Sequence, residues 1–277
     1  MNTDKHKQHI EHIDVLHNGF VRLIDVMGDD KAIVNAARIS YGDGTKTVSE
    51  DRQLIRYLLR NGHTSPFEMC EMKFHIRLPL DTMRQLVRHR TASLNEYSTR
   101  YSIAIDMYNS TNPNEWRGQS KINKQGSGEF IDEENGKIFT NIEEAVISQA
   151  RNSYDELVNY GVAREQARKI LPLGTYTEIY WKIDLRNLMH FLKLRLDIHA
   201  QHEIREYAKA IAKIVKEEFP ITYEAFIDYI LEAVTFSSQE MEIINNIINK
   251  NAIDSCYYQD LSKGEILDFK KKLNIID

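Results

Sequence analysis

Apolar and charged side chains alternate between residues 70 and 78, and this is the clearest periodic pattern in the chain. A period of two predicts a strand with one buried face and one solvent-facing side. Residues 20–27 and 176–183 also have the composition of strands, and residues 101–108 are predicted as another. We therefore expect a few strands that are mostly separated in sequence.

Helical spacing of apolar residues dominates the rest of the chain. Ser49 and Asp81 are predicted N-caps, Gly62 ends the helix that Ser49 begins, and Ser65-Pro66 marks a turn. Because helices predominate over the strands, the pattern predicts an α+β fold. The predicted helices cover approximately residues 29–37, 49–62, 81–88, 142–160, 164–171, 185–196, 199–219, 223–231, 241–248 and 266–273.

The same pattern divides the chain into segments. Residues 1–18 are polar and predicted to be a flexible start, and residues 19–230 are predicted to form the main domain. Within this domain, residues 109–138 are rich in Asn, Gly, Ser and charge, which predicts a long, mobile loop. Residues 231–277 are predicted to be a helical C-terminal extension.

Composition and charge narrow the class of protein. The 277 residues carry a net charge of −5, which argues against a protein that coats nucleic acid. No apolar run approaches the roughly 20 residues of a membrane span, and the N-terminus lacks an apolar signal segment. The two cysteines, Cys70 and Cys256, lie far apart and form no CxxC pattern. We expect a soluble, reduced, cytoplasmic protein.

A dense polar cluster, RHRTASLNEYSTRY, runs from Arg88 to Tyr101. Planar guanidinium groups bind phosphate through paired hydrogen bonds, so local cations on an acidic protein suit a small anionic ligand. The alternative is a solvated helix end that carries an ion pair between Glu96 and an arginine. The density of polar groups favours the ligand.

The cluster resembles the signature of the flavin-dependent thymidylate synthases, which is RHR, seven residues and Ser. Arg88-His89-Arg90 and Ser98 stand at that spacing. Three further segments resemble the same family, and the likeness covers about residues 19–229. These segments are NGHTSPFE (61–68), AREQARKILPL (163–173) and DLRNLMHFLKLRLDIHAQHEI (184–204).

The resemblance implies a helix-rich α+β fold with a small mixed or antiparallel sheet. It also implies a homotetramer whose active sites lie at subunit junctions and use residues from several chains. Members of the family convert dUMP to dTMP for de novo dTMP biosynthesis, with methylenetetrahydrofolate as the carbon donor. FAD, reduced by NADPH, supplies the hydride.

Residue by residue, the resemblance implies two overlapping sites. Those implied to bind dUMP are Gln85, Leu86, Val87, Arg88, Glu96, Tyr97, Ser98, Thr99, Arg100, Arg168 and Arg195. Those implied to bind FAD are His63, Ser65, Arg88, His89, Arg90, Glu96, Asp184, Leu185, Arg186 and His190. No metal is implied.

Arg195 resembles the activating residue of the family. A cation against the uracil carbonyl and N3 stabilises negative charge in the ring, which makes C5 a better carbon nucleophile. The residues alone leave an interhelical salt bridge equally open for Arg195. Two positions depart from the family: Asp184 stands where asparagine is common, and Ser65 where threonine is common. An ionised Asp184 would repel phosphate unless it contacts FAD through its backbone or through the adenosine hydroxyls.

Other candidate chemistry is weaker. His199 and His202 could bind zinc, but we identify no third ligand nearby. Cys70 occupies an apolar strand position, which predicts an inert thiol, and we expect no cysteine nucleophile. Ser98 is predicted to be a ligand for dUMP and not a nucleophile. Two rival functions remain, a non-catalytic nucleotide or RNA binder and a dUMP-binding hydrolase that would need a metal.

Overall fold

The computed structural model describes residues 12–39, 48–120, 126–247 and 262–272. Its strands are β1 (Ile13–Val15), β2 (Gly19–Met27), β3 (Glu71–Pro79), β4 (Ser93–Glu96), β5 (Arg117–Gln119), β6 (Ser127–Phe130) and β7 (Tyr176–Asp184). Five of these form one antiparallel sheet in the order β1-β2-β3-β7-β4, and β5 and β6 form a separate hairpin. The strands predicted at residues 20–27, 70–78 and 176–183 are confirmed as β2, β3 and β7.

The helices follow the predicted order. They are α1 (Asp30–Arg38), α2 (Val48–Arg60), α3 (Ser65–Glu68), α4 (Leu80–Leu86), α5 (Glu133–Asn159), α6 (Arg164–Ala167), α7 (Leu185–Arg195), α8 (His202–Glu218), α9 (Pro220–Phe226), α10 (Ser238–Ile247) and α11 (Lys263–Lys272). A 3-10 turn, η1 (Arg168–Ile170), follows α6, and a π-helical segment, η2 (Ile227–Leu231), continues α9. Helices and one antiparallel sheet together confirm the α+β class.

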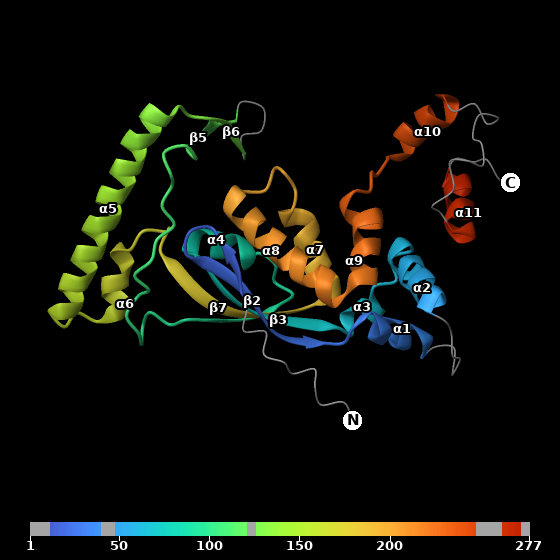
Figure 1. The fold of residues 1–277 in the computed structure, drawn as a ribbon, viewed down its shortest axis with the longest axis horizontal. Coiled ribbons are helices and arrows are strands. Elements are labelled where there is room, and N and C mark those ends of the chain that lie inside the picture. The colour runs from blue at the N-terminus through green and yellow to red at the C-terminus, as the bar shows by residue number, and fades with distance from the viewer. Residues whose placement is uncertain (1–11, 40–47, 121–125, 248–261, 273–277) are drawn as a thin grey trace.

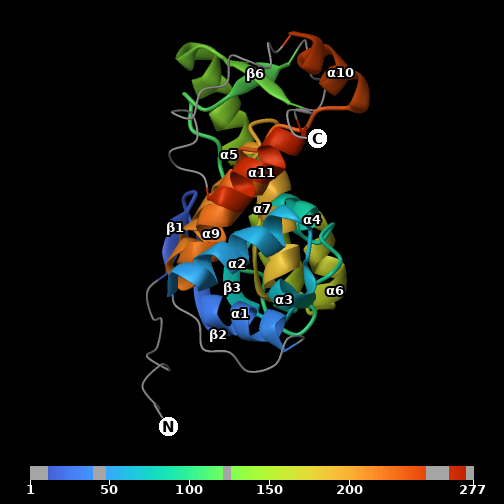
Figure 2. The same ribbon diagram turned by 90° about the vertical axis from the view of Figure 1, so that its right-hand side faces the viewer.

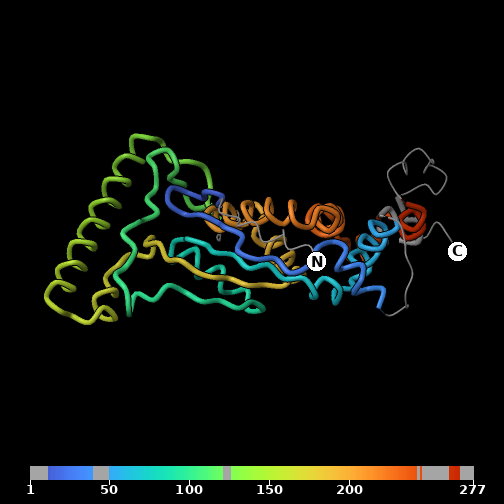
Figure 3. Tube along the Cα trace, turned by 60° about the horizontal axis from the view of Figure 1, so that its bottom comes forward, coloured from blue at the N-terminus to red at the C-terminus, as the bar shows by residue number. Residues whose placement is uncertain are grey.

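The elements form two layers with projections at both ends. Helices α7 and α8 cover one face of the sheet, as the tube view shows (Figure 3). The long helix α5 stands beyond one end of the sheet, next to the hairpin β5–β6 (Figure 1). At the opposite end, α11 lies beside α2 and α9 (Figure 2).

The core lies between the sheet and the helices because each central strand turns its apolar positions to the same side. In β3 the buried side chains are Met72, Phe74, Ile76 and Leu78, at every second position. Opposite Phe74 in the register stands Trp181 of β7, also buried. The strand predicted from alternation is therefore the centre of the sheet.

The N-terminal prediction is wrong for residues 13–15, which form β1 and pair with β2. A turn at residues 16–18 joins the two strands, and Leu16 has a φ of 56° there. The backbone groups of β1 are thus satisfied by sheet hydrogen bonds. Residues 1–11 lie outside the described part of the chain.

The strand predicted at residues 101–108 is wrong. Apart from a bridge between Tyr108 and Thr175, the described chain pairs this segment with no strand. Side chains of α5 satisfy its backbone instead: the Ala104 N–H donates to the Tyr154 hydroxyl at 3.0 Å, and the Ala104 carbonyl accepts from Arg151 at 3.3 Å. Strand composition without a strand partner was misleading here.

The long loop predicted at residues 109–138 is also wrong, because it contains the hairpin β5–β6 and the start of α5. Asp132 caps this helix by accepting from the Asn135 N–H at 3.0 Å. Gly136 lies within the first turns, where a Cβ atom would fall 1.8 Å from the carbonyl oxygen of Pro113. This glycine permits close packing of residue 113 on the helix. In the sequence, the same glycine counts as evidence for a loop.

Several boundaries differ from prediction by a few residues. Ser49 lies inside α2 and Asp81 inside α4, so neither is the cap. Ser65-Pro66 begins the short helix α3, and part of the cluster predicted as loop is the edge strand β4. Gly62, with a φ of 70°, follows α2 as predicted. The tail helices predicted at residues 241–248 and 266–273 are confirmed as α10 and α11.

Candidate active site

The first part of the RHR signature lies against α7. Nε of Arg195 donates a hydrogen bond of 3.0 Å to Nε2 of His89. The His89 ring also lies edge-on to Phe191 at 4.9 Å between ring centres, and 6.2 Å from the His190 ring. The structure therefore brings together three of the predicted site residues, His89 with His190 and Arg195, and Arg195 is 106 positions from His89 in sequence.

The electrostatics of this group leave Arg195 with its full charge. Burial and the neighbouring Arg195 and His190 lower the pKa of His89 to about 4. The ring is neutral at pH 7, so one ring nitrogen can accept from Arg195. Burial lowers the pKa of Arg195, yet a guanidinium stays protonated at pH 7. In the described part of the chain Arg195 pairs with no carboxylate, so the interhelical salt bridge is wrong.

The second part of the signature forms a turn after β4. The Tyr97 N–H donates to the Glu178 carbonyl at 2.8 Å. Arg168 donates through Nη1 to the Thr99 hydroxyl at 3.0 Å, and Arg100 lies 3.6 Å from Glu165. The predicted dUMP residues of this turn thus adjoin Arg168, as the resemblance implies.

Within one chain, the two parts of the signature are separated by β4. Arg88-His89-Arg90 precedes the strand, and Ser98 follows it. A strand of four residues spans about 10 Å between its first and last Cα atoms. Glu96, at the end of β4, accepts from the Thr177 hydroxyl at 2.9 Å. A ligand that touches both parts must therefore be long, or the two parts must come from different chains.

Besides Arg88-His89-Arg90 and Glu96, the residues implied for FAD lie in the segment before α3, on α3, at the end of β7 and on α7. Helices α3 and α7 pack together, and the Leu185 N–H donates to the Cys70 carbonyl at 2.9 Å. His63 precedes α3 and Ser65 is its first residue, while Arg186 and His190 are exposed on α7. The contact between His89 and His190 links this region to Arg195.

The structure gives Asp184 a local role. Its carboxylate caps α7, because Oδ1 accepts from the Asn187 N–H at 2.9 Å and Oδ2 from the Asn187 side chain at 2.6 Å. A carboxylate at a helix N-terminus is stabilised by the helix dipole. The charge that departs from the family is therefore engaged within the chain.

Four further predicted residues differ in exposure. Leu86 and Leu185 are fully buried in the single chain. Val87 is exposed, and the Gln85 side chain donates to the Gln201 side chain. Gln201 was not singled out from the sequence, although it lies in the segment 184–204 that carries the resemblance. Nothing in the sequence indicated Thr177, whose partner Glu96 is 81 positions away.

Cys70 directly precedes β3, and its thiol is buried. Burial and the carboxylates of Asp29 and Asp30 raise its pKa to about 11, so it stays protonated at pH 7. The prediction of a buried thiol is confirmed for Cys70, and Cys256 lies outside the described residues. His199 and His202 contact two different carboxylates, Asp197 and Glu206. Among the residues that the structure places, no group of three or more ligands could hold a metal ion.

Comparison with known proteins places this geometry in a family. A sequence model of the family described as "Thymidylate synthase complementing protein" matches residues 22–221. A flavin-dependent thymidylate synthase of Wolbachia pipientis wMel is 50% identical over 237 residues, which are 84% of this chain and 82% of that protein. The chain belongs to the family of flavin-dependent thymidylate synthases.

Two further comparisons agree with this family membership. An enzyme named flavin-dependent thymidylate synthase from Thermus thermophilus is 52% identical, and the match covers 85% of this chain and 86% of that protein. A crystal structure of a UMP/dUMP methylase, PolB, from Streptomyces cacaoi bound with 5-Br dUMP has a TM-score of 0.71 and 33% identity. It covers 78% of this chain and 98% of the other. The resemblance carried by the RHR signature is confirmed.

The family match also has limits along the chain. It ends at residue 221, so η2, α10 and α11 lie beyond it.

In the part of the chain that the structure describes, no helix is long and apolar enough to cross a membrane.

Proposed function

We propose that this protein converts dUMP to dTMP in the cytoplasm. Methylenetetrahydrofolate is the carbon donor, and FAD, reduced by NADPH, is the source of the hydride. The observation that carries the proposal is the Arg195 cation, held at 3.0 Å by the neutral His89 of the RHR signature in a member of this family.

Arg195 is the proposed catalytic residue. Its charge is not neutralised by a carboxylate among the described residues, so it can act on a ligand. Placed against the uracil carbonyl and N3, it stabilises negative charge that spreads through the ring and activates C5. His89 fixes the guanidinium because a neutral ring accepts its Nε–H.

The residues of the turn after β4 are proposed to hold the rest of dUMP. Arg168 and Arg100 carry positive charge, and Thr99 and Ser98 offer hydroxyl groups. These groups suit a phosphate, which accepts several charge-assisted hydrogen bonds. Ser98 acts as a ligand in this proposal because, among the described residues, its hydroxyl accepts a hydrogen bond from the Arg100 N–H at 3.4 Å and is hydrogen-bonded to no base.

The donor set near α7 fits FAD. Arg88, Arg90 and Arg186 are exposed and pair with no carboxylate among the described residues, and Arg186 donates to the amide oxygen of Asn187. Guanidinium groups without acidic partners suit a diphosphate. The Asp184 carboxylate is held by Asn187 as the cap of α7, so a contact of this residue with FAD is proposed through its backbone or with the adenosine hydroxyls. When bound, the flavin supplies the hydride, so the reaction requires no enzyme thiol.

The protein is proposed to act as a homotetramer with shared active sites. Within one chain, β4 separates the two parts of the signature, so parts from different chains can form one site. A second argument is an apolar stripe on α5, where Ile138, Ile142 and Val146 stand four residues apart and are 54%, 58% and 58% exposed. A helix face of this kind on a projecting helix is suited to contact with another copy.

An absorption spectrum and a turnover assay of the purified protein test the proposal together. We expect a flavin spectrum with bound or added FAD, a change of that spectrum on addition of dUMP, and dTMP formation only when methylenetetrahydrofolate and NADPH are present. A colourless protein that binds dUMP but no FAD would support a pure nucleotide binder. Release of uracil or phosphate from dUMP, dependent on a metal ion, would support a hydrolase.

A further inference from the structure

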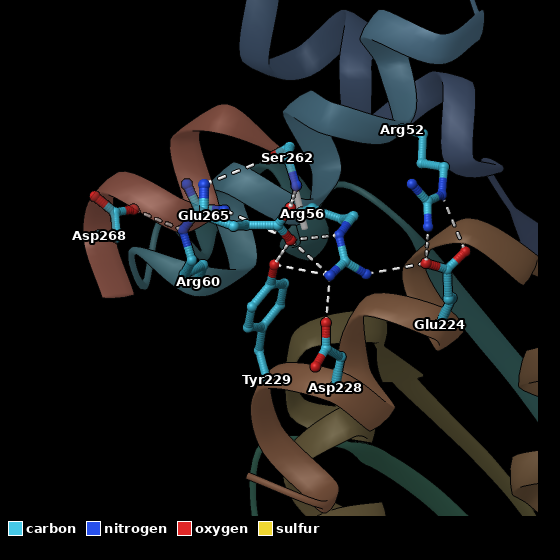
Figure 4. A network of polar contacts seen from close by, with 9 residues as sticks. All are labelled: Arg52, Arg56, Arg60, Glu224, Asp228, Tyr229, Ser262, Glu265 and Asp268. Carbon is cyan, nitrogen blue, oxygen red and sulfur yellow. Dashed lines mark hydrogen bonds and ion pairs between the residues drawn. The ribbon is translucent and has the colours of Figure 1, made fainter. Parts of the chain in front are cut away.

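Three arginines of α2 meet carboxylates of α9, of η2 and of the C-terminal helix α11. Arg52, Arg56 and Arg60 stand four residues apart, and so lie on one face of α2. Carboxylates of two elements approach this face: Glu224 and Asp228 from α9 and η2, and Glu265 and Asp268 from α11 (Figure 4). The tail is thus joined to the main domain by an ionic network, defined here as the α2–α11 clasp.

Arg56 and Glu265 form the buried centre of the clasp, and each is only 7% exposed. Nε and Nη2 of Arg56 donate to Glu265 Oε1 at 2.8 and 2.6 Å, and Nη1 donates to Glu224 at 2.9 Å. Arg56 also donates to Asp228, and Tyr229 donates to Glu265. Charges at this depth require partners, since an unpaired buried charge is strongly unfavourable.

A second series of contacts leads from α11 to a residue of the FAD side. Asp268 accepts from Nε of Arg60 at 2.9 Å, and the Arg60 guanidinium lies 5.8 Å from the Tyr57 ring centre. The Tyr57 ring in turn lies edge-on to the His63 ring at 5.7 Å. Residue 63 is also tied to the end of α2, because its N–H donates to the Leu58 carbonyl at 2.9 Å.

We propose that α11 is a positioning element for the FAD side of the active site. By holding Arg56 and Arg60, Glu265 and Asp268 fix the last turns of α2, and Tyr57 then fixes the His63 ring. The assignment of His63 to FAD rests on the proposed function, whereas the mechanical link from α11 to His63 does not. Glu265 and Asp268 are positioning residues, since neither contacts the reacting groups.

The alternative is that the clasp only stabilises the fold. The contacts of Arg60 favour positioning, because they continue beyond the ion pair to Tyr57 and, through the Tyr57 ring, to His63.

The tail contains a matched control for Glu265. Both tail helices begin with a capping box, in which a serine and a glutamate three residues later exchange hydrogen bonds. Glu265 accepts from the Ser262 N–H at 2.7 Å, and Glu240 accepts from the Ser237 N–H at 2.7 Å. Glutamine also serves in a capping box. Glu265→Gln therefore keeps the cap and removes the charge from the clasp, whereas Glu240→Gln alters only a cap.

The experiment uses the full-length protein and two measurements. Hydrogen exchange of the amides of residues 57–64 reports the position of the α2 end without FAD, and titrations give the dissociation constants of FAD and dUMP. For Glu265→Gln we expect exchange about fivefold faster and FAD binding about fivefold weaker, with dUMP binding unchanged. Glu240→Gln should match the wild type in all three measurements.

A double replacement tests the route through Arg60. If Asp268 acts on His63 through Arg60, Asp268→Asn should weaken FAD binding in the wild-type background and have no further effect in Arg60→Gln. Amide protection of β3 shows whether each variant is folded. If Glu265→Gln does not fold, Asp268→Asn replaces it as the test variant, because Asp268 is only half-buried.

Two outcomes would overturn the inference. One is faster exchange confined to α11, with residues 57–64 unchanged, which would mean that the tail detaches without effect. The other is faster exchange at residues 57–64 with FAD affinity unchanged, which would mean that the clasp stabilises but does not position. If the wild type bound no FAD, the proposed function would fail, and the exchange measurement would still decide the mechanical link.

Discussion

At the scale of single residues, the pairing of Arg195 with His89 is the most informative contact, because it holds a cation with a neutral partner. Arg195→Ala should lower kcat about a hundredfold, the equivalent of roughly 3 kcal/mol of lost electrostatic stabilisation of the activated ring. FAD binding should be retained, since the FAD contacts are proposed for other residues. Steady-state kinetics with a flavin titration measure both, and a near-normal kcat would show that Arg195 is only structural.

His89 itself should titrate near pH 4. Burial is the largest cause of its low pKa, and the charge of Arg195 adds to it. His89 therefore binds a proton less tightly in the folded protein than in the unfolded chain. Because of this difference, the free energy of unfolding decreases as pH falls from about 6.5 towards 4. In Arg195→Met the pKa of His89 should rise but remain below 6.5, because burial persists. NMR of labelled histidine, with His89→Asn for assignment, measures the midpoint. A midpoint unaffected by Arg195→Met would contradict the coupling.

Ser98 provides a further test at this scale. Its hydroxyl accepts from the Arg100 N–H and is hydrogen-bonded to no base in the part of the chain that the structure describes, so we expect a ligand role. Ser98→Ala should weaken dUMP binding about tenfold to a hundredfold through loss of a hydrogen bond to a charged group, while dTMP formation persists at saturating dUMP. Complete loss of turnover at saturation, together with a uracil adduct on Ser98 in rapidly quenched wild-type enzyme, would establish a nucleophile instead.

At the scale of elements, the clasp predicts a dependence of tail docking on pH. Burial alone would raise the pKa of Glu265, but hydrogen bonds from Ser262, Tyr229 and Arg56 lower it to about 2. Because the folded pKa lies below the unfolded value of 4.5, this stabilisation is present above about pH 5 and is lost as pH falls towards 2. The full effect is on the order of 3 kcal/mol.

Hydrogen exchange of the α11 amides can be measured from pH 6 to pH 3 and corrected for the intrinsic dependence of exchange on pH. In the wild type, the protection of these amides should fall progressively as the pH is lowered, because α11 detaches from α2. Glu265→Gln should show a flatter profile because the titrating group is gone, and Glu240→Gln should follow the wild type. An identical profile in all three proteins would assign the acid response to other groups.

The same scale shows what the sequence could predict. Period-two alternation identified β3, and the signature identified the residues around Arg195 and Arg168. The edge strand β4 was missed because all four of its residues are exposed and polar positions give no alternation. The start of α5 was missed because Gly136 is there for close packing with Pro113. The clasp could not be predicted, because Arg56 and Glu265 are 209 positions apart. The sequence around each of them is typical of a solvent-exposed charged residue.

At the scale of the whole molecule, the proposed self-assembly would bring together parts of the signature that lie apart within one chain. Arg88–Arg90 and Ser98 lie at opposite ends of β4, and α5 projects from the domain with Ile138, Ile142 and Val146 exposed. If this stripe packs on another copy, an introduced carboxylate would be buried there at a cost of several kcal/mol. Ile142→Asp should then yield smaller species.

The control for this change is Asn141→Asp, which adds the same charge one residue earlier on an exposed polar position. Light scattering coupled to size-exclusion chromatography gives the mass of each protein, and turnover is measured on the same fractions. We expect Ile142→Asp to dissociate and lose dTMP formation together, because sites built from several chains cannot survive separation, while Asn141→Asp keeps both. A fully active monomer would contradict shared sites, and an intact tetramer in Ile142→Asp would place the subunit contacts away from α5.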